Sequence, residues 1–113
     1  MNRTTQFLDP SIKKKIINEL SELSRDMDST DGPLSGVIKS KIDHKIEYFR
    51  KWMSGDIPSN SGQILMETET MELLVEIAIR NCRSNLSETS SDRIRERCSR
   101  ISRTVRRIAG QTP

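Results

Sequence analysis

One stretch near the carboxyl end of the sequence, residues 93–107, constrains the fold more than any other. It carries seven arginines against a single acidic residue, Glu96. On a helical wheel the apolar residues of this stretch and its continuation to 109 fall in one stripe about 100° wide, and every arginine lies outside it. The stripe consists of Ile94, Cys98, Ile101, Val105, Ile108 and Ala109. The segment therefore predicts a helix that buries one face and leaves a strongly basic face outside the core.

Three further segments repeat apolar residues at steps of three and four, which is typical of amphipathic helices. They are residues 9–27, 34–53 and 63–83. A chain of 113 residues has room for one core only. We therefore predict an all-α, compact four-helix single domain over residues 9–109, with short tails at 1–8 and 110–113.

Turn and capping residues support these boundaries. Asp9 is an N-cap acid followed by Pro10 at the first helical position, where no amide partner is needed. Gly55 ends the second segment. The serine-rich loop at 84–91 offers several caps, and we expect Ser90 or Ser91 to begin the last helix.

The third segment is apolar over more than half of its wheel, and this predicts a central helix that touches several others or a second subunit. A buried strand at 73–79 is the competing interpretation. Apolar residues make up only 33% of the chain, below the roughly 45–50% of a typical domain, so we expect a thin core that a homodimer completes. The predicted interface residues are Met71, Leu74, Val75 and Ala78.

Enzymatic and metal chemistry find little support in the sequence. The one histidine, His44, points away from the apolar face of its helix. Cys82 and Cys98 fall on apolar helix faces and are expected to be reduced, buried thiols, with a disulfide between them as the weaker alternative. Their spacing does not fit a zinc site, and no nucleophile elbow or phosphate-binding loop occurs. We predict a protein that is not an enzyme and has no cofactor.

The sequence also lacks the apolar segments that direct chains into membranes. Its first fifteen residues contain no signal-peptide core, and no stretch approaches eighteen apolar residues. We therefore expect an intracellular protein, cytoplasmic or nuclear, that is neither secreted nor bound to a membrane.

The basic face indicates a polyanionic partner, because arginine presents a planar fork of donors that matches phosphate. We predict a non-enzymatic nucleic-acid-binding accessory or regulatory protein, of a size and composition that suit a viral factor, with RNA favoured over DNA. The predicted phosphate contacts are Arg93, Arg97, Arg100, Arg103, Arg107, Arg50 and Lys51. Because Arg97 and Arg100 lie outside the apolar stripe, their replacement by alanine is expected to leave the fold intact.

Two alternatives stay open at this stage. The arginines can instead pair with glutamates of the third helix. The protein can also be an interaction module, whose third helix and Tyr48/Trp52 edge dock a partner protein. The aromatic residues at 48–52 are more typical of a plug in the core than of a platform for bases. The lysines at 13–15 spread around their helix and are assigned to solvation.

Overall fold

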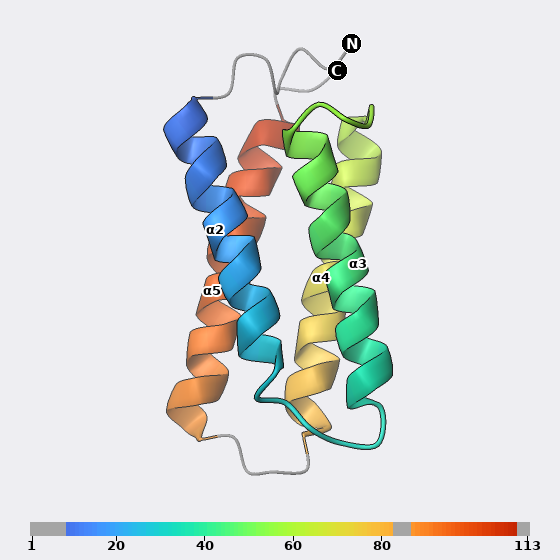
Figure 1. The fold of residues 1–113 in the computed structure, drawn as a ribbon, viewed down its shortest axis with the longest axis vertical. Helices are drawn as coiled ribbons and strands as arrows, with labels where there is room; N and C mark the ends of the chain where they lie inside the picture. Colours follow the sequence, from blue (N-terminus) through green and yellow to red (C-terminus); the bar gives the residue numbers. More distant parts are fainter. Residues whose placement is uncertain (1–8, 83–86, 111–113) are drawn as a thin grey trace.

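The computed structural model describes residues 9–82 and 87–110 of the chain (Figure 1). These residues form four α-helices and no strand, which confirms the predicted all-helical class and shows that the strand at 73–79 was wrong. Successive helices run in opposite directions along one axis (Figure 1). They are α2 (Pro10–Met27), α3 (Ser35–Met53), α4 (Ser61–Arg80) and α5 (Glu88–Ala109).

The helices stand at the corners of a four-sided bundle. α2 packs against α3 and α5, and α4 packs against the same two helices. In an up-and-down bundle of this kind each helix has two main neighbours. The prediction that the third helix is central was therefore wrong, because α4 occupies a corner like the other three.

One buried stripe from each helix meets in a single core. In α2 these residues recur at steps of three and four, which brings them to one side of the helix. The largest fully buried side chains belong to Trp52 and Phe49 near the end of α3. The buried residues of α2 are Ile16, Leu20, Leu23 and Met27, and the apolar ones of α5 are those of the predicted stripe.

Side-chain and glycine caps fix where the helices begin and end. Asp9 accepts a hydrogen bond from the amide of Ser11 at 2.8 Å, as predicted. α5 begins three residues earlier than expected, because Ser87 caps it by accepting from the amide of Ser90 at 3.0 Å. After α3, Gly55 has a φ of 78°, a left-handed conformation that glycine adopts without strain.

The wide apolar surface of α4 is divided between the core and solvent. Leu73 and Met66 lie on its outer side and are 61% and 57% exposed. Met71, Val75 and Ala78, three of the four predicted interface residues, are buried within the chain's own bundle, and Leu74 is half-buried. A homodimer through that stripe thus lacks the exposed surface on which the prediction rested.

Candidate functional site

The arginines of α5 are distributed over three sides of the helix. Arg97 and Arg100 contact acids of α2. Arg95 and Arg106 contact acids of α4. Four of the seven arginines therefore pair with acids of a neighbouring helix. Within the described residues the other three, Arg93, Arg103 and Arg107, do not.

Arg97 joins the middle of α2 to α5. Its Nε donates to Asp26 Oδ2 at 2.8 Å, and its Nη1 donates to Glu19 Oε2 at 3.1 Å. The side chain is only 17% exposed. Burial alone acts to lower the pKa of Arg97, but the hydrogen bond and charge of Asp26, followed by those of Glu19, outweigh it and raise this pKa. The guanidinium is therefore a fixed positive charge that both carboxylates hold in place.

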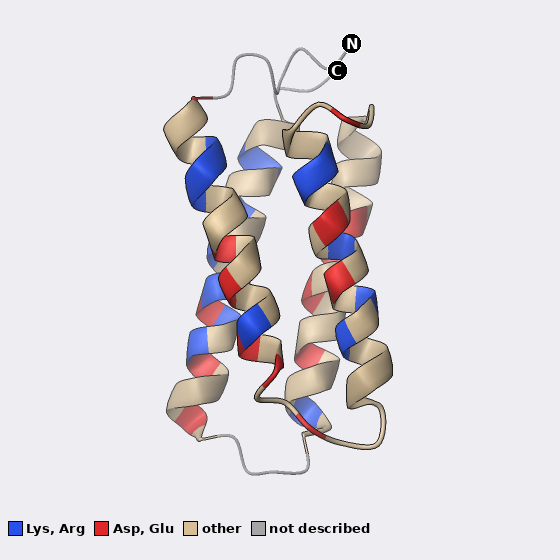
Figure 2. Cartoon of the chain, viewed as in Figure 1, with Lys and Arg blue, Asp and Glu red and all other residues tan. Residues whose placement is uncertain are grey.

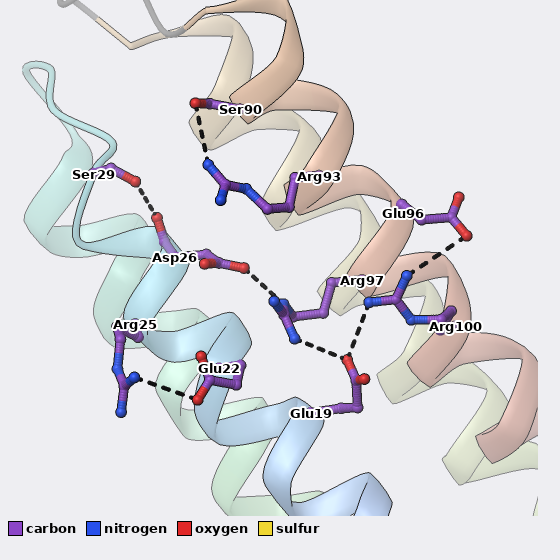
Figure 3. A network of polar contacts seen from close by, with 10 residues as sticks. All are labelled: Glu19, Glu22, Arg25, Asp26, Ser29, Ser90, Arg93, Glu96, Arg97 and Arg100. Carbon is purple, nitrogen blue, oxygen red and sulfur yellow. Dashed lines mark hydrogen bonds and ion pairs between the residues drawn. The ribbon is translucent and has the colours of Figure 1, made fainter.

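Arg100 extends this contact by one turn of α5. Its Nη2 lies 3.5 Å from the same Glu19 oxygen, and its Nη1 lies 3.8 Å from Glu96 (Figure 3). We call Glu19, Asp26, Arg97 and Arg100 the ionic network. The structure gives Arg97 a role in the bundle that the sequence did not predict, since its removal would leave two shielded carboxylates without their main partner. That the fold persists without Arg97 stays a prediction.

On the other flank, α5 pairs with the glutamates of α4. Arg95 donates from Nε and Nη2 to the two oxygens of Glu76, at 3.0 and 2.9 Å. The hydrogen bond from Arg95 lowers the pKa of Glu76 and outweighs the opposing effect of burial, and Arg80 lowers this pKa further. Arg106 donates to Glu72 at 2.6 Å. Intramolecular pairing with the third helix, the alternative left open above, therefore accounts for two of the seven arginines.

The arginines outside these pairs are held loosely. Arg103 lies 3.6 Å from Glu96 on its own helix, and both side chains are exposed. Within residues 9–82 and 87–110, Arg93 contacts only the hydroxyl of Ser90, at 3.5 Å (Figure 3). Arg107 makes no ion pair within the described part of the chain. Exposed charges of this kind contribute little to the stability of the bundle.

A groove lies between the start of α2 and the end of α5 and has a volume of about 340 Å³. Arg100 and Glu19 of the ionic network line it as well, so the groove continues directly from the network. We call this hollow the basic groove. Its apolar side chains are Ile12, Ile16 and Ile101, and its outer cations are Lys15, Arg103 and Arg107.

Sequence reasoning missed Lys15 and Ile12 as members of a site. The lysines at 13–15 do spread around α2, but Lys15 shares the groove with three arginines, Arg100, Arg103 and Arg107, from the other end of the sequence. Figure 2 shows the same juxtaposition as basic bands near the upper ends of α2 and α5, with acidic bands lower on α2. Only the antiparallel pairing of the first and last helices brings these residues together.

The second predicted basic element, residues 48–52, mainly contributes to the packing of the bundle. Trp52 is fully buried and Tyr48 packs edge-on against Phe49, with ring centroids 5.3 Å apart. Arg50 donates to the hydroxyl of Ser21 at 2.6 Å and so joins α3 to α2, whereas Lys51 is exposed. Trp52 therefore plugs the core and offers no exposed surface to a partner, whereas Tyr48 is half-buried.

The nucleophilic and metal-binding side chains form no site. Cys98 is buried, and desolvation raises the pKa of its thiol to about 11. Cys82 differs from the prediction, because it lies beyond the end of α4, is only half-buried, and its Sγ lies 3.3 Å from the Asp31 carboxylate. Both thiols are free. Across 9–82 and 87–110, no group of three potential metal ligands comes together.

No family model, curated protein or solved structure matches this chain. None of the helices described here is long and apolar enough to cross a lipid bilayer.

Proposed function

We propose that this protein binds nucleic acid without catalysing a reaction, RNA in preference to DNA, and that it contacts backbone phosphates at the basic groove. The observation that carries the proposal is the convergence of Lys15, Arg103 and Arg107 from two helices. In the described residues none of these cations pairs with a carboxylate of another helix, and Arg103 lies 3.6 Å from the exposed Glu96 of its own helix. Cations that serve only the fold are expected to have such partners, as Arg95 and Arg97 do.

The proposed contact surface is shorter than the basic face read from the sequence. Glu19 lines the groove, and α2 continues below it with Glu22 and Asp26. These acids would repel a phosphate backbone laid along the whole of α5. A site restricted to one end of the bundle meets few phosphates. It suits a strand end or a loop, which RNA offers more often than DNA.

The test measures binding of a fluorescein-labelled single-stranded RNA of about 12 nucleotides by anisotropy over a range of salt concentrations. The double variant Arg103→Ala/Arg107→Ala should weaken binding and flatten the log–log salt slope by about 1.4, since each phosphate on a single strand contributes about 0.7.

The matched control is Arg95→Ala/Arg106→Ala, which removes the same charge from the same helix. It should leave the salt slope close to that of the unmodified protein, because the proposed site does not include these arginines. Equal losses in both double variants would show that only the net charge matters, and no binding by the unmodified protein would refute the proposal. Circular dichroism of each variant checks that the helices persist.

A second candidate function is docking of a protein partner, including a second copy of the chain, on the outer side of α4. The observation that favours it is the exposure of Met66 and Leu73, which lie two helical turns apart on the same side. Light scattering would test self-association. If the exposed side is used, the unmodified protein should have twice the mass of one chain and Leu73→Asp should have the mass of one chain. A single-chain mass for both proteins would remove the homodimer.

A further inference from the structure

The basic groove combines two surfaces that a phosphate contact alone does not need. Ile12 is 41% exposed although it is a large apolar side chain, and it stands over the more deeply placed Ile16 and Ile101. The outer cations surround this apolar floor. A ligand that fits both surfaces carries a negative charge next to a compact group with an apolar face.

A nucleotide has this construction. The faces of its base are weakly polar, and a single sugar joins the base to the phosphate. Isolated bases are recognised between apolar side chains and against the planes of arginine guanidinium groups. The groove supplies the first in its isoleucines and the second in Arg103 and Arg107. Its volume of about 340 Å³ is at the small end of ligand pockets, which suits one base rather than an extended ligand.

We propose that the basic groove holds one unpaired base of a single-stranded RNA, with the flanking phosphates on Lys15, Arg103 and Arg107. This inference rests on the proposed function and adds the form of the nucleic acid to it. In a duplex the bases are stacked inside and cannot enter the groove. A duplex would also bring a longer run of phosphates toward Glu19, Glu22 and Asp26.

The experiment compares three labelled RNAs at one salt concentration. They are a mixed-sequence single strand of about 12 nucleotides, a strand of equal length in which every nucleotide is abasic, and a blunt-ended duplex with the same number of phosphates. The intact single strand should bind on the order of tenfold more tightly than the abasic strand, whose phosphates are unchanged. It should also bind more tightly than the duplex.

Variants then locate the effect of the base. Ile12→Ala should weaken binding of the intact strand by about fivefold and leave binding of the abasic strand unchanged, because it removes part of the apolar floor and no charge. Leu65→Ala on α4 is the matched control, since this leucine is also partly exposed but lies outside the groove. It should change neither affinity.

The outcomes separate the two proposals. Equal affinity for intact and abasic strands, with a salt slope that depends on Arg103 and Arg107, would refute the base pocket and leave phosphate binding standing. Tighter binding of the duplex would do the same. Absence of binding to all three RNAs would overturn both proposals. An Ile12→Ala effect of the same size on the abasic strand would show that the residue acts on the fold of the groove and not on a base.

Discussion

Two halves of the boundary between α2 and α5 use the same residue type in opposite ways. In the lower half, Arg97 lies between two carboxylates of α2 and is largely shielded from water. In the upper half, Arg107 lies in a groove whose other outer cation on α2 is Lys15, and has no ion pair in the described residues. The two arginines are ten residues apart on one helix. Their different environments come from α2, which carries acids along its middle and a lysine near its start.

The role of each arginine in such a helix therefore depends on the neighbouring helix, and the sequence of the helix alone does not determine it. An arginine beside an acid on the neighbouring helix stabilises the bundle, and one beside a cation is left for a ligand. The predictions below test this division, beginning with the largest expected effect.

Removing an arginine from the ionic network should cost far more stability than removing one from the groove. Arg97→Ala leaves Glu19 and Asp26 partly shielded without their main partner, so we expect a loss of about 1–3 kcal/mol in the free energy of unfolding. Arg107→Ala should change it by about 0.5 kcal/mol or less. Urea denaturation measures both. Equal losses of stability in the two variants would show that Arg97 and Arg107 contribute equally to the fold.

The reactivity of Cys98 reports independently on how firmly α5 is packed, because this residue lies on the buried side of the helix. Its thiol has a pKa of about 11, so at neutral pH little thiolate is present and labelling of the folded protein should be slow. Labelling of Cys98 should speed up in Arg97→Ala and not in Arg107→Ala, because only the first substitution favours opening. Mass spectrometry after a pulse of thiol reagent distinguishes Cys98 from the half-buried Cys82. Rapid labelling of Cys98 in the unmodified protein would contradict the packing of α5.

Lys15→Glu would give the upper half the charge pattern of the lower half. A carboxylate at this position can pair with Arg103 or Arg107, so we expect stability to rise by about 0.2–1 kcal/mol while RNA binding weakens. Thermal unfolding and anisotropy on the same sample test the two effects. Lys14→Glu serves as the control, since Lys14 does not line the basic groove. A loss of binding that is equal in both lysine variants would indicate a diffuse charge effect.

The smallest expected effect concerns acid stability on the opposite flank of α5. Because pairing with Arg95 lowers the folded-state pKa of Glu76 below its ordinary value of 4.5, its contribution is present above about pH 4.5. It is lost as the pH falls through the lowered pKa. Glu76→Gln should therefore make stability less dependent on pH in the acid range, and Glu69→Gln, which alters an exposed glutamate, should not. An unchanged dependence of stability on pH in Glu76→Gln would show that the Glu76–Arg95 pair is too exposed to contribute to stability.

Local features of the sequence were enough to predict the helices. The apolar spacing in residues 9–27 and the cap at Asp9 act within one or two turns, and α2 was predicted almost to the residue. The start of α5 was placed too late because its first turn, from Glu88, contains no apolar residue and several serines can cap. The end of α4 was placed too late because Cys82 continues the apolar spacing past Arg80, where the helix stops.

The site could be predicted only in part, because its contacts join residues far apart in the sequence. Arg97 was correctly placed outside the core, but its partner Glu19 lies 78 residues earlier, and only the pairing of α2 with α5 brings them together. The same pairing brings Lys15 to Arg103 and Arg107. A helical wheel treats each helix separately. The wheels therefore predicted which residues lie outside the core, but not which residues of the other helices these side chains contact.

The alternating direction of the four helices has a further consequence for weak binding. With an even number of helices, the first described helix starts and the last one ends at the same end of the bundle, near the basic groove (Figure 1). Any RNA, peptide or second binding module tethered by a short flexible linker at Pro10 or Ala109 would therefore start beside the groove. Its effective concentration there would be on the order of millimolar. A site with few contacts can in this way contribute to tight binding through avidity, without any change in the groove itself.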